Sequence, residues 1–103
     1  MKRIFEGKVY DTEKAEEIGE YTSIHPVTDF RWYEEHLYKT RKGNYFMVGE
    51  GGPKSPYTTP VGNGISGDKK LIPITEEEAF EWCERTENYD LAEKEFGDMI
   101  EDA

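Results

Sequence analysis

Two aromatic-rich segments separated by a short break constrain the fold of this chain most strongly. Residues 30–40 and 44–50 are both rich in aromatic side chains and free of proline, which is typical of β-strands. The break at residues 41–44 (RKGN) supplies the glycine that a tight hairpin turn needs. We therefore predict a central antiparallel hairpin over residues 30–50, with aromatic side chains on both faces of its first strand.

Shorter elements are expected on both sides of this hairpin. Residues 4–10 predict a second, tight hairpin with Gly7 in its turn. Residues 13–18 follow an Asp-Thr pair that can cap a helix and precede a glycine that can end one, which predicts a short N-terminal helix. Residues 71–74 read as a short strand, and Pro73 favours an edge position because proline donates no hydrogen bond to a neighbouring strand.

The C-terminal 29 residues are typical of two acidic helices. Thr75 and Glu78 have the spacing of a capping box, in which each side chain bonds the backbone N–H of the other residue. A second helix is expected to begin at Asn88 or Asp90. Apolar residues at helical spacing predict the buried stripe of the first helix. This stripe consists of Ala79, Trp82, Cys83 and Thr86.

Together these elements predict a single α+β domain over residues 1–103. Its small antiparallel sheet would combine the N-terminal hairpin, the central aromatic hairpin and the short edge strand. The short N-terminal helix and the two acidic C-terminal helices would pack with that sheet. Seven Tyr, five Phe and two Trp supply buried area that an apolar fraction of 35% would otherwise leave small. One cysteine cannot form an internal disulfide, and neither a signal peptide nor a membrane span is expected, which favours the cytoplasm.

The charge of the chain is distributed very unevenly. The sequence holds 23 acidic and 13 basic residues, for a net charge of −10, and residues 1–74 hold 11 of each. The whole excess therefore lies in residues 75–103, where 12 acidic residues accompany two basic ones. If fully helical, this segment would carry one carboxylate per ~3.5 Å, close to the ~3.4 Å charge spacing of a DNA strand. It is either a solvated face or a surface that binds a basic partner and locally mimics nucleic acid.

A glycine-rich segment follows the central hairpin. Residues 49–70 contain six of the ten glycines and three of the five prolines, which predicts a long loop. Residues 62–67 match G-x-G-x-x-G, but a turn-rich loop is the better interpretation because no helix is expected to follow. Residues 49–53 (GEGGP) lack the ending of a phosphate-binding loop and favour a sharp reversal that packs closely on the sheet over a binding loop.

Few residues offer catalytic or metal-binding chemistry. His25, His36 and Cys83 lack the spacing of zinc ligands, and structural roles are the better interpretation of all three. Glu34 and Glu35 are adjacent in a strand, so they should point to opposite faces and cannot act on one substrate. We therefore expect no enzymatic activity, no cofactor and no metal.

The central hairpin offers a different function, because cations alternate with aromatic rings along residues 30–48. Such a surface can stack on the bases and neutralise the phosphates of single-stranded nucleic acid. The net charge of −10 opposes this binding at long range, and cross-strand packing with solvated charges explains the same pattern. The cations are Arg31, Lys39, Arg41 and Lys42, and the rings are Trp32, Tyr33, Tyr38 and Tyr45.

Three segments carry a resemblance to known proteins. They are residues 7–13 (GKVYDTE), residues 30–53 (FRWYEEHLYKTRKGNYFMVGEGGP) and residues 72–79 (IPITEEEA). Over nearly its full length the chain resembles a family of small acidic proteins from phages and mobile elements of Gram-positive bacteria. The hairpin followed by G-E-G-G is the most specific part. Some proteins of this kind are anti-CRISPR inhibitors of type II RNA-guided nucleases, and the resemblance implies no catalytic residues.

The leading hypothesis is a non-enzymatic inhibitor that occupies a basic nucleic-acid-binding surface of a type II CRISPR nuclease in the bacterial cytoplasm. Such nucleases hold nucleic acid in basic channels, toward which an acidic protein is steered. The alternatives are a nucleic-acid-binding accessory protein that uses the hairpin at residues 30–48 and a small enzyme built on the glycine-rich segment. The candidate partner-binding residues are Glu77, Glu81, Glu84, Glu87, Asp90, Glu93, Glu50 and Tyr33.

Overall fold

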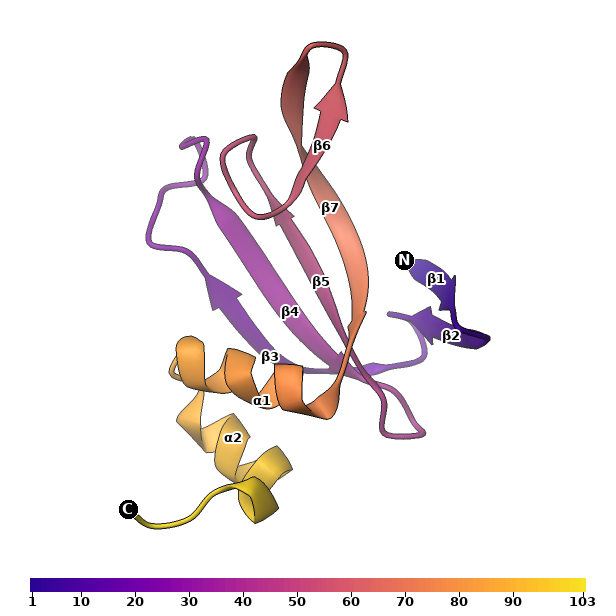
Figure 1. Cartoon of the computed structure of the whole chain (residues 1–103), viewed down its shortest axis with the longest axis vertical. Coiled ribbons are helices and arrows are strands. Elements are labelled where there is room, and N and C mark those ends of the chain that lie inside the picture. Colours follow the sequence, from indigo (N-terminus) through magenta and orange to yellow (C-terminus); the bar gives the residue numbers. More distant parts are fainter.

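A computed structural model describes all 103 residues and shows an α+β fold with two antiparallel sheets (Figure 1). The two-stranded sheet consists of β1 (Lys2–Phe5) and β2 (Lys8–Asp11). The five-stranded sheet consists, in spatial order, of β3 (Glu16–Thr22), β4 (Tyr33–Lys39), β5 (Tyr45–Gly51), β7 (Gly64–Ile74) and β6 (Thr58–Val61). Two helices follow, α1 (Glu76–Arg85) and α2 (Tyr89–Phe96), and then a 3-10 turn over Gly97–Met99.

The predicted central hairpin is confirmed as the pair β4–β5. Its register runs from Tyr33 opposite Gly51 to Lys39 opposite Tyr45, and Gly43 in the turn has a φ of +85°. The first strand begins at Tyr33 rather than at residue 30. The reason is a turn at Asp29, whose side chain accepts a 2.8 Å hydrogen bond from the backbone N–H of Arg31.

The predicted N-terminal hairpin is also confirmed, and it covers the second face of the large sheet. Its turn holds Glu6 and Gly7, both with positive φ, as a two-residue hairpin of type I′ requires. Tyr10 of β2 packs edge-to-face on Phe46 at 5.8 Å between ring centroids. Phe46 forms a buried cluster with Tyr10, Val48 and Leu71. The chain itself therefore buries the apolar side chains on this outer face of the sheet.

The prediction of a helix over residues 13–18 is wrong, because strand β3 occupies residues 16–22. Asp11 accepts a 2.9 Å hydrogen bond from the N–H of Glu13, which forms a turn instead of a helix cap. Gly19, which was expected to end the helix, lies within β3. A Cβ atom there would come within 2.6 Å of Leu91 Cδ2, so this glycine allows α2 to pack against the strand.

The expected long loop over residues 49–70 is largely replaced by a hairpin. Strands β6 and β7 pair through residues 58–61 and 64–67, and Gly62 turns between them with a φ of +57°. The hairpin projects away from the helices at the opposite end of the molecule (Figure 1). Residues 68–74 of β7 pair with β5 and not with β6, and Pro73 lies in this part of the strand.

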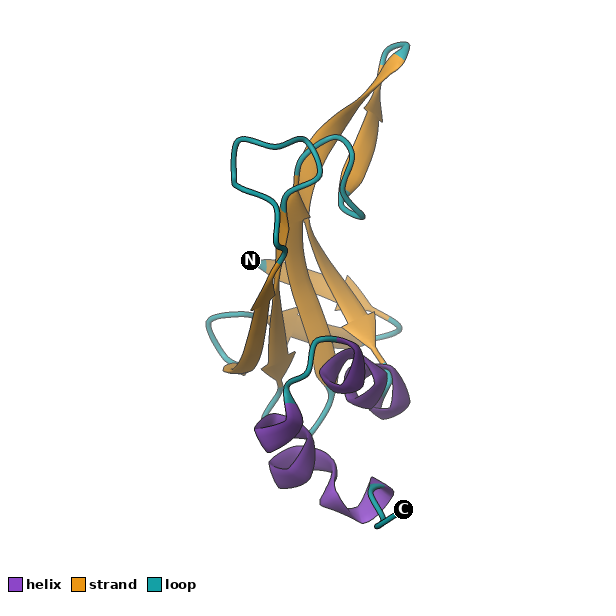
Figure 2. Ribbon diagram, turned by 90° about the vertical axis from the view of Figure 1, so that its left-hand side faces the viewer, coloured by secondary structure: helices purple, strands orange, loops and turns teal.

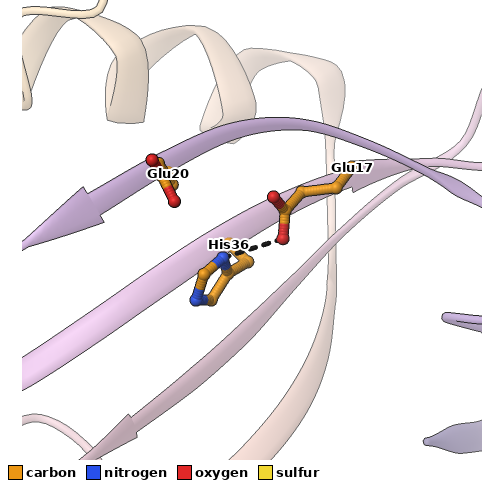
Figure 3. A group of neighbouring side chains, drawn as sticks. All are labelled: Glu17, Glu20 and His36. Atoms are coloured by element: carbon orange, nitrogen blue, oxygen red, sulfur yellow. Dashed lines mark ion pairs between the residues drawn. The ribbon is translucent and has the colours of Figure 1, made fainter.

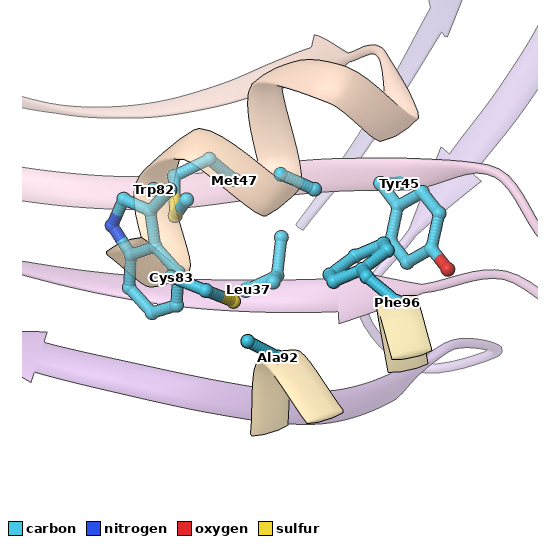
Figure 4. Packing of buried hydrophobic residues seen from close by; sticks show 8 residues of the cluster. Leu37, Tyr45, Met47, Trp82, Cys83, Ala92 and Phe96 are labelled. Carbon is cyan, nitrogen blue, oxygen red and sulfur yellow. The ribbon is translucent and has the colours of Figure 1, made fainter. Parts of the chain in front are cut away.

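The core lies between the large sheet and the helices (Figure 4). Thr75 and Glu78 form the predicted capping box at the start of α1, with hydrogen bonds of 2.9 and 3.1 Å. The inward stripe of α1 is buried at Ala79, Trp82 and Cys83, as predicted. These side chains pack with Leu37, Tyr45, Met47, Ala92 and Phe96. Neither helix has the length and apolar character needed to cross a membrane.

Candidate partner-binding surface

Helices α1 and α2, which carry most of the acidic residues of positions 75–103, lie at one end of the molecule (Figure 2). Burying the stripe around Trp82 turns the opposite side of α1 toward solvent. We call the six exposed carboxylates that were predicted here the acidic helical surface. They are Glu77, Glu81, Glu84, Glu87, Asp90 and Glu93. The bend between α1 and α2 prevents one long rod of charge, so any likeness to a nucleic-acid strand is confined to short stretches.

The acidic helical surface carries more negative than positive charge, since only Arg85 and Lys94 accompany its carboxylates on these helices. Among the 12 acidic residues of positions 75–103, Glu95 alone forms an ion pair, at 2.9 Å from Lys39 Nζ. The hydrogen bond from Lys39 lowers the pKa of Glu95. None of the six members of the acidic helical surface forms an ion pair. Their negative potential therefore extends into solvent, where a positive partner can neutralise it.

The turn that joins α1 to α2 places an acidic residue where glycine is preferred. Glu87 has a φ of +59°, in the left-handed region, directly after the C-terminal residues of α1. The N–H of Asn88 donates a 2.9 Å bond to the carbonyl of Cys83, which completes a helix-ending motif that usually contains glycine at this position. A non-glycine residue in this conformation costs about 1 kcal/mol or more.

An apolar depression of about 410 Å³ opens beside these carboxylates, between α1, α2 and the C-terminal residues. Tyr89, Met99 and Ile100 line it, and all three side chains are exposed. Acidic side chains surround the apolar lining. Aromatic and methionine side chains inside a charged rim are the usual composition of a protein–protein contact. The rim residues are Glu84, Glu93 and Glu101.

The structure separates the two remaining candidate residues from this surface. Glu50 lies on β5 directly opposite Glu34, and a hydrogen bond with Glu34 raises its pKa. Both residues belong to the outer face of the sheet. Tyr33 is half-buried on the helix-facing side, with its ring 5.9 Å from that of Tyr21 and 6.3 Å from that of Tyr57. Neither residue is therefore part of the acidic helical surface.

The G-E-G-G segment serves close packing, as predicted, but it does not form the expected sharp reversal, because Gly49–Gly51 continue strand β5. A Cβ atom on Gly49 would lie 2.0 Å from the Tyr57 ring, so only glycine leaves room for this tyrosine. Tyr57 donates a hydrogen bond to the buried carboxylate of Glu35, and Trp82 Nε1 donates another at 3.0 Å. Burial, with Glu35 alongside, raises the pKa of Tyr57. The burial of Glu35 could not be predicted from the sequence, because Glu34 and Glu35 are adjacent and chemically alike.

The other chemical motifs are placed as follows. Residues 62–67 form the β6–β7 turn and the start of β7, so no helix N-terminus follows them. Glu34 and Glu35 point to opposite faces of the sheet, as predicted. Burial raises the pKa of Cys83 to about 11, which keeps this thiol protonated at neutral pH. His25 lies in the loop between β3 and β4.

The central hairpin has fewer free groups for nucleic acid than its sequence suggests. Arg31 pairs with Asp29 at 2.9 Å, and Lys39 pairs with Glu95. Tyr38 stacks on Phe46 with 5.0 Å between ring centroids, which occupies one face of its ring. Tyr45 is buried. The two remaining cations of the hairpin, Arg41 and Lys42, line a depression of about 420 Å³ between the N-terminal hairpin and the β4–β5 turn. Lys8 and Lys14 line the same depression.

Comparison of the chain with protein-family models, with curated proteins and with solved structures found no match.

Proposed function

We propose that this chain is a binding protein, not an enzyme, and that the acidic helical surface binds a basic macromolecular surface. The observation that carries the proposal is the set of exposed, unpaired carboxylates on α1 and α2. Following the sequence resemblance, we further propose that it is an anti-CRISPR inhibitor from a mobile element, acting in the bacterial cytoplasm. Its target would be a type II RNA-guided nuclease, with or without guide RNA.

Two kinds of interaction support this assignment. The uncompensated carboxylates attract a positive surface over several ångströms and raise the rate of encounter. The depression containing Tyr89, Met99 and Ile100 then offers an apolar contact at short range. Type II nucleases bind nucleic acid in positively charged channels, which have the charge that this surface requires.

The conformation of Glu87 gives independent support. A strained residue that a simple glycine would relieve indicates a local requirement for its side chain. Because Glu87 connects the two helices, its carboxylate extends the charge of Glu84 toward Asp90.

A charge-reversal experiment tests the proposal. Reversing Glu77, Glu81 and Glu84 to Lys should slow association with a purified type II nuclease–guide RNA complex, measured by surface plasmon resonance, and the difference should shrink at high salt. A matched variant reverses three other exposed carboxylates and changes the net charge equally. It carries Glu6→Lys, Glu13→Lys and Glu16→Lys. Equal losses in both variants, or a loss in neither, would contradict the assignment of the acidic helical surface.

The basic depression keeps the nucleic-acid alternative testable in the same experiment. Guide RNA and single-stranded DNA are titrated alone against the wild-type chain and against a variant carrying Arg41→Ala and Lys42→Ala. We expect no binding that depends on these two cations. Tight binding of free nucleic acid that the double variant abolishes would favour the accessory-protein function instead.

A further inference from the structure

A histidine and several carboxylates meet on the outer face of the large sheet, beside the N-terminal hairpin and away from the acidic helical surface. Glu17 and Glu20 come from β3, and His36 comes from β4 (Figure 3). Residues three apart in a regular strand point to opposite faces. Here the pairing shifts between Glu17 and Gly19, which is a β-bulge, and both carboxylates reach the face that carries His36.

The imidazole of His36 is the unusual member of this group. Its Nδ1 lies 2.8 Å from Glu17 Oε1, but the two atoms are not aligned for a hydrogen bond. Nδ1 is consequently a buried nitrogen without a hydrogen-bond partner. The other ring nitrogen, Nε2, lies 3.7 Å from Glu34 Oε1. Nε2 thus lies near the Glu34 carboxylate but beyond hydrogen-bond distance, and Nδ1 lies beside Glu17.

The charges around His36 favour a bound cation. Glu34 and Glu50 are direct cross-strand neighbours, an arrangement of like charges that destabilises a sheet. Lys69, which is the cross-strand neighbour of Glu50, lines the adjoining depression of about 240 Å³ with the N-terminal residue Met1, His36 and three of the carboxylates. Those carboxylates are Glu17, Glu34 and Glu50.

We propose that His36 Nδ1, Glu17 and Glu20 bind a divalent transition-metal ion of the zinc class, with the Glu34 carboxylate near enough to Nε2 to accept its N–H after a small side-chain movement. Zinc accepts imidazole and carboxylate ligands, and a carboxylate on the second ring nitrogen is the usual support of a histidine ligand. The ligating atoms of the three residues already lie within 4.8 Å of one another. A tetrahedral ion with bonds of roughly 2.0–2.2 Å brings ligand atoms to roughly 3.3–3.5 Å. Glu17, whose side chain is 43% exposed, is free to move by this amount.

The depression beside the site leaves room for a fourth ligand, which water or a partner's side chain can supply. The site lies on a different face from the acidic helical surface and does not depend on the proposed inhibitor function. A bound ion would also link β3 to β4 where the bulge interrupts their pairing.

Isothermal titration of the full chain with Zn²⁺ tests this proposal. We expect one ion per chain, and His36→Ala should weaken binding by about tenfold or more. The matched control is His25→Ala, which removes the other histidine, and Mg²⁺ should bind far more weakly than Zn²⁺ because it prefers oxygen ligands. Buried Cys83 does not compete for the ion. Equal zinc affinity of the wild type and His36→Ala, or an equal loss in His25→Ala, would overturn the site.

A second pair of variants covers the case in which His36→Ala does not fold. Glu17→Gln with Glu20→Gln should lose zinc binding, whereas Glu13→Gln with Glu16→Gln should retain it with the same change in charge. Co²⁺ provides the spectroscopic readout, because its visible absorption changes when imidazole and carboxylate replace water. If the two double variants gave the same Co²⁺ spectrum, general surface charge would hold the ion, and the proposed site would be wrong.

Discussion

At the scale of single residues, the buried carboxylate of Glu35 joins parts of the chain that are far apart in sequence. It accepts hydrogen bonds from Tyr57, in the segment before β6, and from Trp82 on α1. A buried carboxylate is tolerated only when such donors satisfy it. The glycine at position 49 belongs to the same arrangement, since it leaves the space that the Tyr57 ring occupies.

Replacing this glycine should therefore disturb the whole group. Gly49→Ala places a methyl group 2.0 Å from Tyr57 Cζ, and we expect a loss of about 1–3 kcal/mol in the free energy of unfolding from overpacking. Gly97→Ala is the control, because nothing lies within 4 Å of its Cβ and its φ of −54° suits alanine. Urea denaturation followed by circular dichroism measures both. An unchanged midpoint for Gly49→Ala would show that the ring moves aside freely.

At the scale of elements, one ion pair joins helix α2 to strand β4. Lys39 donates to Glu95 and lowers its pKa, so the pair stabilises the folded chain above the ordinary carboxyl pKa and loses its effect as the pH falls. At pH 7 the free energy of unfolding of the wild type should exceed that of Glu95→Gln by no more than about 1 kcal/mol, because Lys39 is partly exposed. Denaturation midpoints at several pH values test this. A difference that is constant or grows toward low pH would contradict it.

The turn between α1 and α2 should show stability and binding changing in opposite directions. Glu87→Gly relieves the left-handed conformation and should raise the free energy of unfolding by about 1 kcal/mol. The same change removes a carboxylate from the acidic helical surface and should slow association with a basic partner. Glu87→Gln keeps the strain but removes the charge. If Glu87→Gly bound the partner as fast as wild type, the strain would need another explanation.

The elements that sequence reasoning found are those whose signals are local. Each of these signals spans only a few residues of the chain. They are the turn at Gly43, the capping box of Thr75 and Glu78, and the stripe around Trp82. The β3 strand was missed because a turn at Asp11 and a helix cap look alike in sequence. Gly19 was misread for a tertiary reason, its contact with α2.

The candidate sites divide in the same way. The exposure of the six helical carboxylates could be predicted, because charge and helical spacing are visible along the chain. The group around His36 was missed because it depends on a bulge and on the pairing of β3 with β4, which no spacing in the sequence reveals. The sequence interpretation therefore assigned His36 a structural role.

At the scale of the whole molecule, unpaired negative charge opposes folding. Ten net charges concentrated in 29 residues repel one another, and dissolved salt screens that repulsion. The urea midpoint of the wild type should therefore rise between low salt and about 0.3 M NaCl. The variant with Glu77, Glu81 and Glu84 reversed to Lys should show a smaller rise. A wild-type midpoint that falls with added NaCl would mean that ion pairs such as Lys39–Glu95 dominate.

The molecule is also longer than its chain length requires. Its extents are 47 × 35 × 19 Å and its radius of gyration is 14.8 Å, against about 13 Å for a compact domain of 100 residues. The β6–β7 hairpin and the helices lie at opposite ends of the long axis (Figure 2). The two ends of the molecule are therefore well separated along its long axis.

Burial and charge are carried by different residues of α1 and α2. The helix side chains that pack in the core against the sheet are Ala79, Trp82, Cys83, Ala92 and Phe96. None of the six carboxylates of the acidic helical surface is among them. Substitutions on the solvent side therefore leave the packing of the core intact. The charge that this end of the molecule presents can change one residue at a time on an unaltered scaffold.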